Sequence, residues 1–144
     1  MKKFKFTLEN VLTLKLSIEE NEKMVLAELK GKQNILVSER RALEDEYIEV
    51  IQKKREVLKT GTTPIEVLQI SNYAKEVQNR INIKNEEIKE LVKQIDIQVE
   101  VVKQAATEVK TLEKLKEKQL KEYNEKAAKE TELAIEEFVS NKVS

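Results

Sequence analysis

Four groups of neighbouring carboxylates are the residues of this sequence that could do acid–base chemistry. They are Glu19-Glu20, Glu44-Asp45-Glu46, Glu86-Glu87 and Glu136-Glu137. Two carboxylates act as general acid and general base only when both side chains face the same substrate. Neighbouring residues of a helix point about 100° apart, because one turn contains about 3.6 residues. We therefore interpret each group as part of a solvated helix face, mixed with lysines, and not as a catalytic pair.

Other catalytic groups are missing from the sequence. It contains no cysteine and no histidine, which excludes disulfides, thiolate nucleophiles, imidazole bases and the usual zinc ligands. Gly31 and Gly61 belong to no glycine-rich phosphate-binding motif. The 27 basic residues balance the 27 acidic ones, so no overall field favours nucleic acid. We expect a protein that is not an enzyme and has no cofactor, metal site or nucleic-acid partner.

The composition favours long paired helices over a compact globule. Charged residues make up 38% of the 144 residues and aromatic residues only 4%. The opening MKKFKFTLENVLTLKLSIEE is not typical of a secretion signal, because Glu9 and Lys15 interrupt its apolar patch. No run of about 18 apolar residues is present to span a bilayer. We expect a cytoplasmic protein, and peripheral attachment to a membrane machine stays open.

Apolar residues recur every three or four positions from Ile70 to Leu112, which is the spacing of a coiled-coil seam. One row consists of Ala74, Ile81, Ile88, Ile95, Val102 and Val109. The other row consists of Ile70, Val77, Lys84, Leu91, Gln98, Ala105 and Leu112. The 3.5-residue interval keeps the stripe straight, so this helix must lie along a partner helix.

The first helix is predicted over about residues 7–59, with Thr7 as N-cap, and the arm before it, Met1 to Phe6, is expected to fray. Its apolar rows are Val11, Ile18 and Val25, followed by Leu29, Leu36, Leu43, Val50 and Val57. The seam is therefore expected to shift around the helix between Val25 and Leu29. The alternate seam positions are Leu26, Gln33, Arg40, Tyr47 and Lys54.

Residues 60–63 are predicted to form a bend. Gly61 suits the left-handed position that closes a helix, and Thr63, Pro64 and Glu66 are typical of an N-cap, a first helical residue and a capping box. Because the bend is short, the second helix, about 64–141, must fold back antiparallel on the first. We predict an all-α fold, an antiparallel coiled-coil hairpin forming a single domain, 1–144. The alternative is one continuous helix in a parallel dimer.

The two helices are unequal, so the second is expected to overhang from about Glu122 onward. Apolar residues continue along this overhang, namely Tyr123, Ala127, Leu133, Ala134 and Phe138. An apolar stripe without a partner suggests a docking surface. Tyr73 lies beside the seam near the bend, where it either packs across the edge of the coiled coil or contacts a partner.

Two further stretches are distinctive. The first is Phe4-Lys5-Phe6-Thr7-Leu8-Glu9-Asn10-Val11-Leu12; the second is Leu112-Glu113-Lys114-Leu115-Lys116-Glu117-Lys118, with Tyr123 and Glu136-Glu137-Phe138 after it. Together with the bend and the unequal helices, they resemble the FliJ family of the flagellar protein export apparatus, which has an F-x-F-x-L-E-x-V-L opening. Ala134-Ile135-Glu136-Glu137 departs from the Leu-Asp-Glu of many members.

The resemblance implies a rod similar to the stalk subunit of rotary ATPases. Such a rod would bind the centre of the hexameric export ATPase FliI and contact the export gate protein FlhA, with FliH and export chaperones as further partners. It would couple the ATPase ring to the gate at the inner face of the cell membrane, and so serve flagellum biogenesis, protein transport, and chemotaxis and motility.

The resemblance also assigns site residues. It gives the ATPase-facing role to Phe4, Phe6, Leu8, Leu115, Tyr123 and Phe138, and the gate-facing role to Tyr73 and Val77. Two alternatives stay open: the equivalent stalk protein of a virulence type III secretion system, and a structural peripheral-stalk or scaffold coiled coil, which would need a permanent helical partner.

Overall fold

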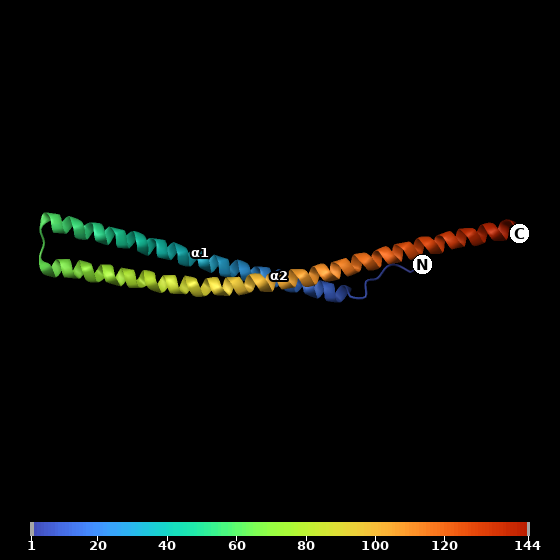
Figure 1. Ribbon diagram of the computed structural model, residues 1–144, viewed down its shortest axis with the longest axis horizontal. Helices are drawn as coiled ribbons and strands as arrows, with labels where there is room; N and C mark the ends of the chain where they lie inside the picture. The colour runs from blue at the N-terminus through green and yellow to red at the C-terminus, as the bar shows by residue number, and fades with distance from the viewer. Residues whose placement is uncertain (1, 144) are drawn as a thin grey trace. The chain divides into compact units, whose positions relative to one another are not determined.

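The protein consists of two long helices joined by a short bend. The computed structural model describes residues 2–143 and contains α1, Glu9–Thr60, and α2, Pro64–Val143, with no strand in that part of the chain (Figure 1). The helices have 52 and 80 residues. The predicted all-α hairpin with a longer second helix is confirmed, and the helix bounds differ from the predicted ones by at most two residues.

The chain forms two compact units, and each helix runs through both. Unit 1 comprises the chain up to Lys23 and from Val101 onward, and unit 2 is Met24–Glu100. Met1 and Ser144, the ends of the predicted single domain, lie outside the described residues. That the chain forms one domain stays a prediction.

The bend of unit 2 has the left-handed cap and the N-cap that the sequence predicts, but only half of the predicted capping box. Gly61 has a φ of 97°, and its N–H donates to the Val57 carbonyl at 3.0 Å, which closes α1 in a left-handed cap. The Thr63 hydroxyl accepts a hydrogen bond from the Glu66 N–H at 3.3 Å, so Thr63 is the N-cap of α2. The Glu66 carboxylate accepts a hydrogen bond from the neighbouring Thr62 hydroxyl.

In unit 2 the predicted seam of α2 faces α1. Ala74, Val77, Ile81, Ile88, Leu91 and Ile95 are buried there. Arg40 donates to Asn85 Oδ1 at 3.1 Å, and the Lys84 ammonium lies 2.5 Å from the Glu39 carboxylate, which raises the pKa of Lys84. Farther along α1, Glu46 pairs with Tyr73. The contact residues of α2 therefore have lower residue numbers as those of α1 become higher. The pairing is therefore antiparallel (Figure 1).

In unit 1, α1 begins later than predicted. The Leu8 carbonyl accepts the first helical hydrogen bond, from the Leu12 N–H at 2.9 Å, so Leu8 occupies the N-cap position and not Thr7. The Glu9 N–H donates to the Phe6 carbonyl at 3.1 Å, which makes a turn just before the helix. The turn delays the helix by two residues.

The predicted shift of the α1 seam is wrong. Val11 and Val25 are 40% and 41% exposed, whereas Leu12 is buried. Positions spaced by seven residues from Leu12, and a second series from Lys15, are buried or half-buried without a change of phase: Leu12, Glu19, Leu26, Gln33, Arg40, Tyr47 and Lys54, and Lys15, Glu22, Leu29, Leu36, Leu43, Val50 and Val57. Lys and Glu fit such positions because their aliphatic stems cover apolar surface while their charged ends reach water.

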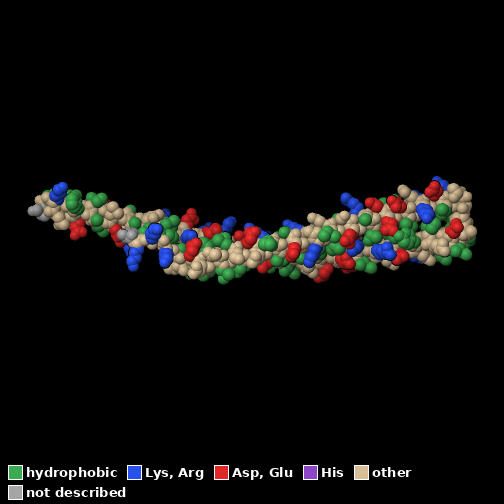
Figure 2. All heavy atoms as spheres, turned by 180° about the vertical axis from the view of Figure 1, so that it is seen from behind, with side chains coloured by type: hydrophobic (Ala, Val, Ile, Leu, Met, Phe, Trp, Pro, Cys, Tyr) green, Lys and Arg blue, Asp and Glu red, His purple; other side chains and the backbone are tan. Residues whose placement is uncertain are grey.

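Both charge signs are mixed on the surface of the protein where Figure 2 shows it. On the face shown in Figure 2, lysine and arginine side chains alternate with aspartate and glutamate, and hydrophobic side chains lie between them. Glu44, Asp45, Glu86 and Glu87 are exposed and Glu46 is half-buried. Among residues 2–143 no group of three or more acidic side chains could hold a metal ion.

Candidate partner-binding site

The N-terminal arm, residues 2–8, packs against unit 1 and does not fray as predicted. Phe6 is buried with Leu12 of α1 and Val109 of α2. Phe4, Leu112 and Leu115 pack around these three, and the six residues together are called the terminal cluster. The arm is extended rather than helical, so it places two aromatic rings two residues apart on the same apolar stripe of α2.

Tyr123 continues the terminal cluster along α2. Its ring lies 5.6 Å from that of Phe4, measured between centroids, with an angle of 53° between the ring planes. Its hydroxyl donates a hydrogen bond to the Lys2 carbonyl, and Lys116 pairs with Glu9 at 2.8 Å. The ring contact and the hydrogen bond hold the arm against α2, and the ion pair holds the first residue of α1 there.

A groove between the arm and α2 presents cations to solvent. Its walls combine the aromatic rings of Phe4 and Tyr123 with the side chains of Lys2, Lys3, Lys5, Gln119, Glu122 and Lys126. The lysines outnumber the single carboxylate, so the groove favours an anionic partner surface.

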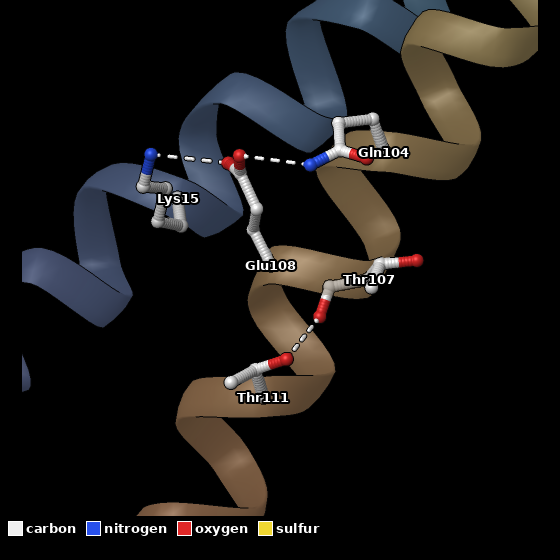
Figure 3. A network of polar contacts seen from close by, with 5 residues as sticks. All are labelled: Lys15, Gln104, Thr107, Glu108 and Thr111. Atoms are coloured by element: carbon white, nitrogen blue, oxygen red, sulfur yellow. Dashed lines mark hydrogen bonds and ion pairs between the residues drawn. The ribbon is translucent and has the colours of Figure 1, made fainter.

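A polar network fixes the pairing farther along unit 1 (Figure 3). The Lys15 ammonium of α1 lies 3.0 Å from the Glu108 carboxylate of α2, and Gln104 donates to the same carboxylate at 3.3 Å. The hydrogen bond from Lys15, followed by that from Gln104, lowers the pKa of Glu108. Lys15 was predicted only as an interruption of an apolar patch, yet it occupies a seam position and bonds across it.

The end of α2, residues 128–143, is exposed along its whole length and is called the uncovered end. It carries the exposed apolar side chains Leu133, Ile135, Phe138, Val139 and Val143. Lys142 places its ammonium 5.4 Å from the centre of the Phe138 ring. The overhang therefore starts a few residues later than Glu122, because the arm covers α2 as far as Tyr123.

The structure brings together only part of the predicted ATPase-facing set. Phe4, Phe6, Leu115 and Tyr123 meet in or beside the terminal cluster. Leu8 lies exposed at the start of α1, and Phe138 lies on the uncovered end. Their role in partner binding stays a prediction. Leu12, Val109 and Leu112 complete the cluster. Seven-residue spacing predicted Val109 and Leu112 as seam residues, whereas on α1 it led to Val11 and not to Leu12.

The predicted gate-facing residues lie in unit 2 and differ in access. Tyr73 is exposed, and its hydroxyl donates to the Glu46 carboxylate of α1, which raises the pKa of Tyr73. This is the edge packing that its place beside the seam suggested. Val77 is 0% exposed, so a partner can contact Tyr73 directly but can reach Val77 only if the helices separate.

Neither helix, over the described residues, contains a stretch that is long and apolar enough to cross a membrane. Exposed apolar side chains are instead distributed singly along charged helices, with local concentrations at the uncovered end and at the bend.

The fold and the terminal cluster define a two-helix antiparallel coiled coil whose longer helix continues past the covered region. A chain from Chlamydia trachomatis described as a YscO homolog has a similar fold, with a TM-score of 0.69 and 23% sequence identity over 94% of this chain and 90% of that one. No curated protein matches the sequence. The family model described as flagellar FliJ protein matches residues 4–144. The chain therefore belongs to the FliJ family and is a coiled-coil protein of the type III export apparatus.

Proposed function

We propose that this protein is a non-enzymatic rod that couples the flagellar export ATPase FliI to the export gate protein FlhA. In this role it promotes assembly of the ATPase ring and the entry of substrates, with FliH and export chaperones as further partners, at the inner face of the cell membrane. The observation that carries the proposal is the uncovered end, because it leaves apolar side chains in water on a member of the FliJ family.

We place the ATPase-facing surface on unit 1. The uncovered end is a single helix of 16 residues with exposed Ile135, Phe138 and Val139. A single helix is narrower than a helix pair and can enter the ring more easily. The groove beside Tyr123 adds lysines at the base of this helix. We assign ATPase contact to the uncovered end and to the outer surface of the terminal cluster.

The gate-facing surface is assigned to unit 2 through Tyr73. Its ring is exposed, and its hydroxyl is already bonded to Glu46, so the ring is held in one place before any partner arrives. A peripheral-stalk scaffold is disfavoured by comparison, because it would require a permanent helical partner, whereas α1 and α2 pair within this chain.

The ATPase assignment is tested with the purified chain and the export ATPase from the same cell. The chain truncated after Ala128 keeps the arm and Tyr123 but lacks the exposed residues that follow. We expect the full chain to raise ATP turnover and the hexamer fraction, and the truncated chain to lose most of this stimulation. Stimulation that survives truncation would contradict the assignment.

Two single substitutions sharpen this test. Phe138→Ser changes an exposed apolar residue on the uncovered end, and Ile83→Ser changes a similarly exposed residue of unit 2. We expect only Phe138→Ser to weaken stimulation.

The gate assignment is tested with Tyr73→Ala, measured by capture of the cytoplasmic part of FlhA. This substitution should weaken gate binding while leaving ATPase stimulation unchanged. Equal capture by the unchanged protein and by the variant would remove Tyr73 from the gate surface.

A further inference from the structure

The bend of unit 2 differs in composition from the rest of the chain. Residues 60–72 contain one charged side chain, Glu66, although charged residues make up 38% of the sequence. Three large apolar side chains project into solvent around the bend, with Leu58 55%, Ile65 68% and Leu68 59% exposed. Neither the coiled-coil seam nor the proposed gate contact at Tyr73 uses these side chains.

Cations lie beside and behind Leu58 on α1. The last two turns of α1 carry Lys53, Lys54, Arg55 and Lys59, with Glu56 as the single acidic residue among them. None of these four forms an ion pair with any of the residues 2–143. Lys54 and Arg55 precede Leu58 by four and three residues, so they share its helix face about 5 Å farther from the bend.

The three threonine hydroxyls of the bend are hydrogen-bonded within the chain. Thr60 donates its hydroxyl hydrogen to the Glu56 carbonyl at 3.1 Å, Thr62 donates to the Glu66 carboxylate, and Thr63 accepts from the Glu66 N–H. Internal hydrogen bonds lower the cost of removing such groups from water. The bend can therefore enter a less polar environment without leaving its three threonines unpaired.

This arrangement matches a target that is itself layered. A membrane surface presents anionic headgroups above hydrocarbon, and proteins that bind it place apolar side chains about 5–10 Å deep with basic side chains at headgroup level. Leu58 and Ile65 lie within about one turn of the bend, and Lys59 lies beside Leu58, whereas Lys53, Lys54 and Arg55 lie about one turn farther from the bend than Leu58. We infer that the bend of unit 2 binds the surface of an anionic membrane, with Leu58, Ile65 and Leu68 inserted and the four cations on the lipid phosphates.

Glu66 limits the affinity of this surface. Its carboxylate lies at the bend, where it opposes the cations. Glu66→Gln removes the charge and keeps an oxygen that can accept the Thr62 hydrogen bond, so this substitution strengthens binding to an anionic membrane. The membrane contact goes beyond the proposed coupling function and does not depend on it.

Co-sedimentation with vesicles tests the inference. The full chain is mixed with vesicles of phosphatidylcholine alone and with vesicles that also contain phosphatidylglycerol. We expect sedimentation only with the anionic vesicles and its loss at high salt. No sedimentation with the anionic vesicles, or equal sedimentation with both kinds, overturns the inference.

Matched variants locate the contact. Replacement of Lys53, Lys54, Arg55 and Lys59 by Gln, or of Leu58, Ile65 and Leu68 by Ser, should lower vesicle affinity by about tenfold or more. Replacement of Lys89, Lys93 and Lys110, three exposed lysines on α2 away from the bend, by Gln removes nearly as many cations and should leave affinity within about twofold. The opposite result, with affinity lost in this control variant and kept in the bend variants, overturns the inference. Circular dichroism checks that each variant folds.

A fluorescent label reports insertion directly. The chain contains no cysteine, so Leu58→Cys provides one site for an environment-sensitive dye. Ile83→Cys is the control, because Ile83 is slightly more exposed than Leu58 but lies away from the bend. A blue shift with anionic vesicles at Leu58→Cys and not at Ile83→Cys supports insertion of the bend. The same shift at both sites, or at neither, contradicts it.

Discussion

One stretch of α2 is buried and another is fully exposed, although both are helical. In unit 2, Ile88 is 9% exposed within the row from Ala74 to Ile95, whereas in unit 1 Phe138 is 64% exposed on the uncovered end. The buried stretch has an unbroken row of apolar residues at seven-residue intervals, and the uncovered end does not. The comparison shows that helix formation and helix pairing are separate properties of this sequence.

Local sequence explains why the uncovered end is helical without a partner. Alanine, glutamate, lysine and leucine, which are strong helix formers, fill most of it. Glu125, just before the uncovered end, is also spaced four residues from Lys129 in the favourable order. Its exposed apolar residues therefore add nothing to pairing within the chain and are available to a partner.

The largest expected effect comes from placing a charge in the buried stretch. Ile88→Lys should cost about 3 kcal/mol or more of unfolding free energy, because the ammonium must leave water or force the helices apart. Phe138→Lys is the matched control and should change that free energy by less than about 0.5 kcal/mol. Urea unfolding followed by circular dichroism measures both, and similar losses in the two variants would break the comparison.

A smaller effect is expected at the terminal cluster. Phe6→Ala removes a buried ring from unit 1 and should cost about 2–4 kcal/mol where the site cannot collapse around the space. The arm should then lose its protection from hydrogen exchange, while residues 74–95 keep theirs. Unchanged protection of the arm would mean that Phe6 does not anchor it.

The bond between Tyr123 and the arm should contribute less. Tyr123→Phe keeps the ring against Phe4 and removes only the hydroxyl that donates to the Lys2 carbonyl. We expect a loss of about 0.5–1.5 kcal/mol, confined to the arm and read as faster exchange of its amides. Tyr123→Ala serves as the stronger control, because it removes the ring as well.

The smallest effect is expected on the stability of the folded protein at acid pH. Because Lys15 and Gln104 lower the pKa of Glu108 in the folded protein, its stabilising contribution is present above the ordinary carboxyl pKa of 4.5. That contribution is lost as the pH falls through the lowered folded-state value. Glu108→Gln should therefore make the melting temperature fall less steeply below about pH 4.5. Glu113→Gln, a carboxylate on the same helix, should leave the steepness unchanged; an equal change in both variants would contradict the assignment.

The sequence was sufficient to predict the hairpin, because its signals are local and periodic. The α2 seam was predicted by its spacing, and the bend by Gly61, Thr63 and Pro64, whose chemistry admits few other structures. The same reasoning failed on α1. There Val11 and Val25 were taken for seam residues because they are apolar, although Lys15 and Glu22 hold the seam positions with their aliphatic stems.

The arm was the other failure, and its cause is different. Phe4 and Phe6 pack on residues of α2 that are more than a hundred positions away in the sequence, and no local period encodes such a contact. The sequence shows the spacing of Phe4 and Phe6 in the arm, but only the fold shows which residues of α2 they contact. Site residues that depend on this contact, such as Tyr123, could therefore be named from the resemblance but not placed.

Hydrogen exchange along α2, with and without the export ATPase, tests the account most directly. In the free protein we expect slow exchange from Ala74 to Val109 and fast exchange from Ala128 to Val143. With the ATPase added, protection should appear in residues 128–143 and in the arm. Protection of residues 128–143 in the free protein, or its absence in the presence of the ATPase, would contradict the claim that the uncovered end is the partner-binding part of this molecule.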